Sequence, residues 1–169
     1  MDARELRELQ APLKERYRAK PEAALVTLRA QGRLDGAGLT CKVETGRALV
    51  EAGPHPATGG DGLRACSGDM LLEALVACAG VTLRAVATAL DIELRGGSIS
   101  AEGDLDFRGT LGVDKEAPVG FAEIRLRFEV ETSAPQDKLD LLLKLTERYC
   151  VVYQTIRSGP KVSVSMKRM

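Results

Sequence analysis

Four cysteines, Cys41, Cys66, Cys78 and Cys150, are the side chains best suited to nucleophilic or redox chemistry in this chain. They are scattered singly, and the sequence contains no C-x-x-C pair of the kind that structural zinc sites use. The sequence therefore predicts no structural zinc site and no other metal centre. Cys41 falls in a predicted strand and Cys66 in a predicted loop, where most cysteines are buried fillers or incidental surface thiols. The other two cysteines have more distinctive surroundings.

Cys78 and Cys150 occupy positions where a thiol could react. Cys78 lies in a long apolar segment beside Ala77, Ala79 and Gly80, whose small side chains leave room for a ligand or a closely packed partner helix. Cys150 lies between two predicted helices, where free backbone N–H groups and the dipole of the second helix are expected to lower its pKa. Each cysteine taken alone is also consistent with a small buried hydrophobe, so both interpretations stay open at this point.

The only histidine, His55, lies between Pro54 and Pro56 in a glycine-rich stretch, residues 53–68. A Ser-His-Asp or Cys-His catalytic site would have to use this imidazole, and the alternative is an exposed loop histidine. The stretch does not lead into the Gly-Lys-Ser/Thr of a phosphate-binding loop. It also lacks a GxGxxG motif after a clear strand, which a dinucleotide-binding site would need. The sequence therefore does not predict a nucleotide-binding loop.

Residues 69–90 form the segment around which the other elements are expected to pack. Good helix formers outnumber β-branched residues, and apolar side chains occur on every face, which is typical of a helix buried on all sides. Ser67 is the expected N-cap, and Asp69 suits the positive end of the helix dipole. A membrane span is the competing interpretation, but it would place Glu73 and Arg84 within the hydrocarbon. We therefore predict a core helix that carries Cys78.

Length, charge and composition favour a single globular domain. The chain has 169 residues, and its 24 basic and 24 acidic residues cancel, so a nucleic-acid partner is not expected. Trp is absent and aromatic residues make up 4% of the sequence, which argues against a stacking platform for bases. Residues 1–10 lack the apolar core of a signal peptide, so we expect a cytoplasmic protein with no membrane partner.

The remaining segments predict an α+β fold. Residues 2–19 are expected to form two short helical pieces that are separated at Pro12 and pack outside the main core. A turn is expected at residues 35–38. Strands are expected at residues 25–30, 39–44, 47–51, 98–107, 122–131 and 161–167.

Residues 122–131 give the clearest strand pattern. Apolar residues alternate with charged ones, so the strand is expected to have one dry face, covered by the helix over residues 69–90, and one wet face. The apolar residues are Ile124, Leu126, Phe128 and Val130. Next comes a predicted helix capped by Thr132 or Ser133, with Pro135 early, that reaches Arg148 or Tyr149. A short second helix is expected to end at residues 158–160.

Two segments of the chain resemble the OsmC/Ohr family, which contains osmotically inducible protein C and the organic hydroperoxide resistance proteins. The first is GGDGLRACSGDMLLEALVACAGVTL, in which a glycine-rich loop leads to an LLxALxAC helix around Cys78. The second is ERYCVVYQTI at residues 147–156, around Cys150. The resemblance covers residues 25–169, which we predict to be an OsmC-like domain, and leaves residues 1–24 as an N-terminal helical extension.

The resemblance implies an intertwined α+β homodimer in which antiparallel sheets wrap around long buried central helices. It also implies a thiol-dependent peroxidase that reduces organic hydroperoxides and acts in oxidative stress defence. Cys78 would be the peroxidatic thiol and Cys150 the resolving thiol, joined by an intramolecular disulfide after a sulfenic acid forms. No bound cofactor is implied, and an external dithiol of the lipoyl type, or a lipoylated protein, would reduce the disulfide.

The sequence departs from the family pattern near the start of the Cys78 helix. Peroxidases of the family usually carry Asn-Pro-Glu there, with the Glu ten residues before the cysteine, whereas this chain has Gly68 at that position and Asp69 one step on. The Glu normally holds an Arg that activates the thiolate, and Arg33 resembles the Ohr arginine. Arg33 and Asp69 are therefore the candidate substrate-binding or thiolate-activating residues.

Two further arginines, Arg47 and Arg64, are candidates for the same task, and Val151 stands where many members have proline. Without a nearby cation, burial is expected to raise the pKa of Cys78. An alternative function is that of a divergent family member that binds a small apolar ligand or senses redox state without turnover. A purely structural interaction protein is a third alternative.

Overall fold

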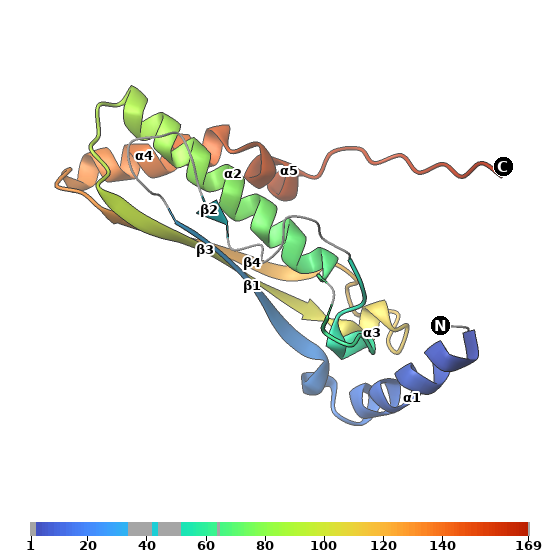
Figure 1. Cartoon of the computed structure of the whole chain (residues 1–169). Helices are drawn as coiled ribbons and strands as arrows, with labels where there is room; N and C mark the ends of the chain where they lie inside the picture. Colours follow the sequence, from blue (N-terminus) through green and yellow to red (C-terminus); the bar gives the residue numbers. More distant parts are fainter. Residues whose placement is uncertain (1–2, 34–41, 44–51, 64, 169) are drawn as a thin grey trace.

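The computed structural model describes residues 3–33, 42–43, 52–63 and 65–168. It is a mixed fold in which helices lie on one antiparallel sheet, with strand order β2-β1-β3-β4 (Figure 1). The longer helices are α1, α2, α4 and α5, which span Ala3–Ala19, Ser67–Ala89, Gln136–Tyr149 and Val151–Ser158. The strands β1 to β4 span Leu25–Arg33, Lys42–Val43, Gly96–Asp106 and Phe121–Glu131, and the short helices η1, η2 and α3 span Pro21–Ala24, Pro56–Thr58 and Phe107–Thr110.

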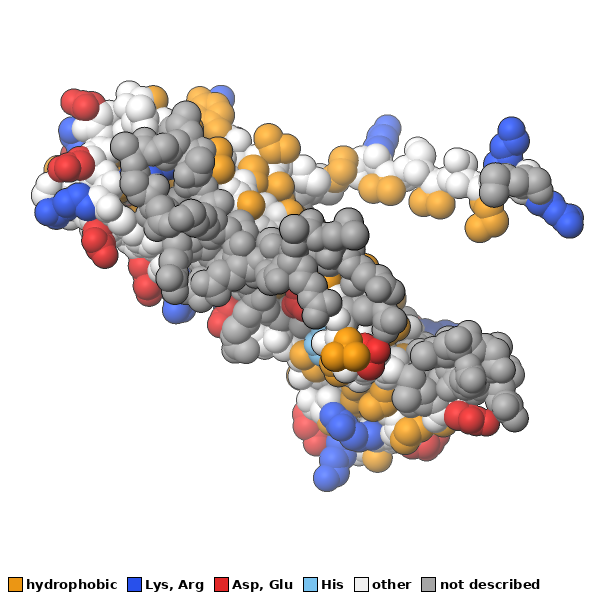
Figure 2. Space-filling view, viewed as in Figure 1, with side chains coloured by type: hydrophobic (Ala, Val, Ile, Leu, Met, Phe, Trp, Pro, Cys, Tyr) orange, Lys and Arg blue, Asp and Glu red, His pale blue; other side chains and the backbone are white. Residues whose placement is uncertain are grey.

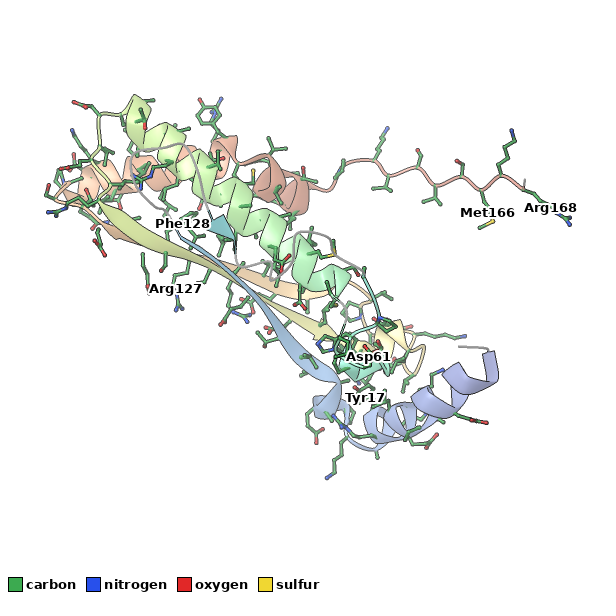
Figure 3. The ribbon with its side chains drawn as sticks, viewed as in Figure 1. Tyr17, Asp61, Arg127, Phe128, Met166 and Arg168 are labelled. Carbon is green, nitrogen blue, oxygen red and sulfur yellow. The ribbon has the colours of Figure 1, made fainter. Side chains whose placement is uncertain are left out.

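The sheet is built on β3, which pairs with β1 on one side and β4 on the other. On β4, Phe128 is half-buried and Arg127 is exposed, and the two side chains point to opposite sides of the strand (Figure 3). This alternation confirms the predicted dry and wet faces. However, α2 packs mainly on β1 and β3, so the dry face of β4 borders a groove instead of lying under α2.

The core forms where α2 meets β3. Leu72, Val76 and Ala79 are completely buried on the inner face of α2, as are Ile99 and Ala101 on β3. A contiguous apolar contact of this kind supplies most of the free energy that holds a helix on a sheet. The core helix predicted around Cys78 is therefore present, extended by two residues at its start.

The expectation that α2 is buried on all sides is wrong for the single chain. Its outward side exposes Met70, Leu71 and Val81. By length and composition α2 is apolar enough to cross a membrane, but half of its most apolar window is buried within this fold. Its one buried cation, Arg84, donates a hydrogen bond from Nη1 to the Leu94 carbonyl at 2.6 Å. α2 thus has one packed face and one apolar face with no cover in the chain.

The N-terminal region departs from its prediction in two ways. Pro12 lies inside one continuous helix, α1, because the loss of a single backbone N–H costs less than the contacts that hold the helix. α1 also joins the core, since the completely buried Tyr17 donates a hydrogen bond to the Ala57 carbonyl at 2.7 Å. The extension is therefore fastened to the loop that leads into α2.

Two predicted helix caps are wrong. Ser67 is the first residue of α2 and Cys66 occupies the N-cap, while α4 is capped by Pro135. Thr132 instead donates its hydroxyl to the Glu93 carbonyl at 2.6 Å, which ties the start of the α4 connection to the residues before β3. The Thr132 oxygen also accepts the Ala134 amide at 3.1 Å, so it caps the turn before Pro135 and not α4 itself.

The strand predicted at residues 161–167 does not form in the single chain. Residues 159–168 contain no regular element and extend away from the body as an exposed tail (Figures 1 and 2). Val162, Val164 and Met166 alternate along the tail with exposures of 80%, 92% and 100%. Of the predicted strand at 39–44, Lys42–Val43 is confirmed as β2, whereas the strand at 47–51 and the turn at 35–38 lie outside the described residues.

Candidate functional site

The fold brings together the two cysteines that the sequence singled out. Cys78 lies in the middle of α2, and Cys150 lies at the junction where α4 ends and α5 begins. Because α2 packs against both α4 and α5, Cys150 lies close enough to Cys78 for each thiol to shift the pKa of the other. Cys66, Cys78 and Cys150 are all free thiols. The predicted position of Cys150 between two helices is confirmed.

The environment of Cys78 favours its thiolate. Burial alone raises the pKa of this thiol, but hydrogen bonds from the Val152 and Val151 amides, the Cys150 thiol and the Thr82 hydroxyl lower the pKa below its ordinary value overall. The two amides are the first N–H groups of α5, which have no acceptor within their own helix and point their positive ends at the sulfur. Burial acts on the pKa of Cys78 as expected, but the hydrogen bonds outweigh it.

The environment of Cys150 has the opposite effect. This thiol is 1% exposed, and burial together with the negative charge on Cys78 raises its pKa to about 11. The Tyr153 amide donates to its sulfur at 3.5 Å and lowers that pKa only in part. The expectation of a lowered pKa at Cys150 is wrong, because burial of the thiol outweighs the Tyr153 and Val152 amides that lower its pKa. Of the two thiols, Cys78 therefore ionises first, while Cys150 keeps its proton.

Sequence reasoning missed Thr82. This residue follows Cys78 by four positions, so the two side chains lie on the same side of α2 one turn apart. That spacing is the signal that could have identified it. Thr82 can donate a hydrogen bond to the thiolate but cannot ionise at neutral pH, so it stabilises charge on Cys78 without competing for the proton.

Thr82→Val is expected to slow alkylation of Cys78 by iodoacetamide at pH 7 by about 2- to 10-fold, the worth of one ordinary hydrogen bond. Without the hydroxyl, the pKa of Cys78 rises and the thiolate fraction falls at any pH below that value. The rates of variant and wild type should converge at high pH, where both thiols are ionised. Thr88→Val is the control, because the Thr88 hydroxyl donates to the Arg84 carbonyl at 2.9 Å. Unchanged alkylation in Thr82→Val would contradict the assignment.

Asp69 does not join the thiol pair within the chain. It precedes Cys78 by nine positions, which places it on the opposite side of α2 and about 14 Å along the helix axis. Burial raises the pKa of Asp69, and the charge of His55 opposes that shift. The neighbouring Glu73 also has a raised pKa, through burial and then through Asp69. Gly68 is the second residue of α2.

The arginine candidates are described only in part. Arg33 is the last residue of β1, paired in the ladder with Lys42 and Ser98, and its backbone alone is described. Arg47, Arg64 and also Cys41 lie outside the described residues. Among the described residues, the groups that shift the pKa of Cys78 include no cation. The described groups that lower this pKa are the Val152 and Val151 amides, the Cys150 thiol and the Thr82 hydroxyl.

His55 has a structural position. Its Nδ1 accepts the Ala57 amide at 3.0 Å and caps η2, and its ring stacks on Phe107 with centroids 5.1 Å apart. The histidine is half-buried rather than exposed, and its imidazole is held in the loop before α2. In the described parts of the chain, no group of three or more His, Cys, Asp or Glu side chains could hold a metal ion.

A wide apolar groove of about 1220 Å³ lies beside the thiol pair. It runs between β4, α4 and α5 and reaches the outward side of α2. Tyr153 belongs to both features, since its amide contacts the Cys150 sulfur and its side chain lines the groove. The apolar residues lining it include Leu71, Leu75, Ile124, Leu126, Phe128, Leu139, Leu142, Leu143 and Ile156.

Comparisons with known proteins agree with the fold. No curated protein matches the sequence significantly. Among solved structures, the chain is similar to an OsmC-like hydroperoxide resistance protein from Jannaschia sp. CCS1, with a TM-score of 0.60 and 14% identity over 86% of this chain and 95% of that one. Residues 59–165, which include both Cys78 and Cys150, match the family model described as OsmC-like protein. The chain therefore belongs to the OsmC-like family.

Proposed function

We propose that this protein is a thiol-dependent peroxidase that reduces organic hydroperoxides through Cys78 and Cys150. The observation that carries the proposal is the pair itself, in which a Cys78 thiol of lowered pKa accepts a hydrogen bond from a neutral Cys150 thiol. A thiolate is the reactive form of cysteine, and a neighbouring thiol can resolve its oxidised product. Membership of the OsmC-like family and likeness to a hydroperoxide resistance protein support the same activity.

The chemistry follows from the two thiols. The Cys78 thiolate attacks the O–O bond, an alcohol leaves, and the sulfur becomes a sulfenic acid. Cys150 then attacks this sulfur, which forms the disulfide and releases water. An external dithiol, in our proposal of the lipoyl type, reduces the disulfide by exchange. Cys78 is half-buried and Cys150 is buried, so the incoming thiolate is expected to attack the Cys78 sulfur.

The α5 amides and Thr82 are proposed to replace the usual activating arginine at the thiolate. Backbone N–H groups at a helix N-terminus stabilise an anion without a formal charge of their own. The roles of Arg33 and Asp69 in binding the peroxide or activating the thiolate remain predictions. The apolar lining beside the pair favours an alkyl hydroperoxide over hydrogen peroxide, because burial of the alkyl group adds binding free energy.

The protein is further proposed to act as a cytoplasmic homodimer. The groove exceeds the roughly 300–1,000 Å³ of ordinary small-molecule pockets and continues onto the exposed side of α2, which suits a second copy of the chain. β4 is the last strand of the described sheet, and the tail has strand alternation without a partner. An intertwined dimer would let the tail of one copy pair with the sheet of the other. Met166 and Arg168 mark the free end of this tail (Figure 3).

The experiment that tests the proposed function is multiple-turnover consumption of cumene hydroperoxide and hydrogen peroxide with dihydrolipoamide as reductant. We expect repeated turnover that requires the dithiol, a preference for the organic peroxide, and one Cys78–Cys150 disulfide in protein oxidised without reductant. Mass spectrometry of the oxidised protein identifies the linked peptides. Absence of turnover from a folded, fully reduced protein would contradict the proposal.

A second candidate function rests on the size of the apolar groove. A divergent family member could bind a small apolar ligand there, or sense redox state through one oxidation of Cys78. This alternative predicts that peroxide oxidises the pair once, stoichiometrically, and that excess dithiol sustains no rapid turnover. The same assay therefore separates the two functions.

A further inference from the structure

The proton on Cys150 is held in an unusual position. The thiol is 1% exposed and lies where α5 packs against α2, while the Tyr153 amide donates to the Cys150 sulfur at 3.5 Å and fixes it. The thiol interacts with Cys78, so its proton lies beside the sulfur that a peroxide must reach. The other groups that donate to Cys78 are two amides and the Thr82 hydroxyl, none of which gives up a proton at neutral pH.

Breaking the O–O bond of an alkyl hydroperoxide requires a proton. The departing alkoxide is strongly basic, and a positioned acid lowers the barrier to its departure. His55 is stacked on Phe107 in the loop before α2, and Asp69 lies on the opposite side of the helix from Cys78. Within the described residues, Cys150 is thus the ionisable group that contacts Cys78.

We propose that Cys150 is the general acid of peroxide reduction as well as the resolving thiol. This inference rests on the proposed peroxidase function. It gives Cys150 a role in the first chemical step, before any sulfenic acid exists, and it makes proton transfer the event that prepares the second step.

The Cys78 thiolate forms a bond to the terminal oxygen of ROOH, the O–O bond breaks, and the electron pair leaves with the RO oxygen. The Cys150 proton passes to that oxygen, which leaves as ROH, while the peroxide's own proton stays on the oxygen now bound to sulfur. The products are a Cys78 sulfenic acid, ROH and a Cys150 thiolate. The new thiolate displaces hydroxide from the sulfenic acid and forms the disulfide.

This arrangement couples resolution to peroxide reduction. In the resting protein Cys150 keeps its proton, since burial and the charge on Cys78 both disfavour a second thiolate. Once Cys78 is oxidised, that charge is gone and Cys150 has lost its proton in the same step. Cys150 thus becomes a nucleophile only after a sulfenic acid has formed beside it.

The test compares two oxidants in single-turnover oxidation of reduced protein, followed by stopped flow. Cumene hydroperoxide leaves a basic alkoxide that needs a proton, whereas peracetic acid leaves a carboxylate that does not. The quantity measured is the ratio of the two rate constants, in which changes in the thiolate fraction of Cys78 cancel. In Cys150→Ala this ratio is expected to fall by about 100-fold or more relative to wild type, the usual worth of a general acid.

Cys150→Ser keeps a donor group at the site and is expected to retain a larger part of the ratio than Cys150→Ala. Cys66→Ala removes a thiol about 18 Å along α2 from Cys78 and is expected to leave the ratio unchanged. An unchanged ratio in both Cys150 variants, with wild type reacting rapidly, would overturn the general-acid role alone. If wild type reacts with neither oxidant, the proposed function fails together with the inference.

Discussion

Cys78→Ser is expected to abolish peroxide turnover, leaving consumption at the rate of the reductant alone. The α5 amides and Thr82 stabilise a thiolate at this position, but a serine hydroxyl is far too weak an acid for the same contacts to ionise it near pH 7. The expected loss is about 1,000-fold or more, as for removal of the nucleophile in other enzymes. Cumene hydroperoxide consumption under excess dihydrolipoamide measures it.

Substitutions of Cys78 and Cys150 are expected to change peroxide consumption in different ways. Cys150→Ser keeps the nucleophile, so one equivalent of peroxide is consumed before turnover becomes slow and dependent on dithiol concentration. Cys66→Ser should turn over like wild type, since Cys66 lies at the opposite end of the helix segment that leads to Cys78. Full activity in Cys78→Ser would place the chemistry on another thiol and refute the proposed mechanism.

The two candidate cysteines could be identified from sequence, but the directions of their pKa shifts could not. The apolar run around Cys78 and the helix junction at Cys150 are local features, and both are confirmed. Which sulfur receives the α5 amides depends on how α2 packs beside α5, a contact between segments far apart in the chain. From sequence, the helix dipole was expected to act on Cys150 alone, whereas in the fold the α5 amides act on both sulfurs and burial outweighs them at Cys150.

The misread elements have a related cause. Pro12 interrupts no helix, because the buried Tyr17 anchors the last turns of α1 to the loop before α2. The alternating residues of the tail specify two faces for a strand but not the strand that must pair with it. Local patterns define what an element can be, and tertiary or quaternary contacts decide whether it forms.

The proposed homodimer is expected to depend on the exposed side of α2, and Val81 is the best residue for testing this. Val81 is 41% exposed on the outward side of α2, three positions after Cys78, so the proposed dimer contact and the thiol lie on neighbouring parts of one helix surface. An unpaired arginine buried in an apolar contact costs about 3–5 kcal/mol, which corresponds to a loss of affinity of at least 100-fold. Val81→Arg is therefore expected to sediment as a monomer at micromolar concentration, where wild type sediments as a dimer.

Val119→Arg is the matched control for this prediction. Val119 is 65% exposed between α3 and β4 and does not line the groove, so the same substitution there should leave the dimer intact. A dimer is also expected to shield Cys78, so monomeric Val81→Arg should react faster with a bulky thiol reagent than wild type while losing peroxide turnover. A wild-type protein that sediments as a monomer, or a Val81→Arg variant that remains dimeric, would instead mean that the exposed side of α2 faces solvent and that the single chain holds the complete site.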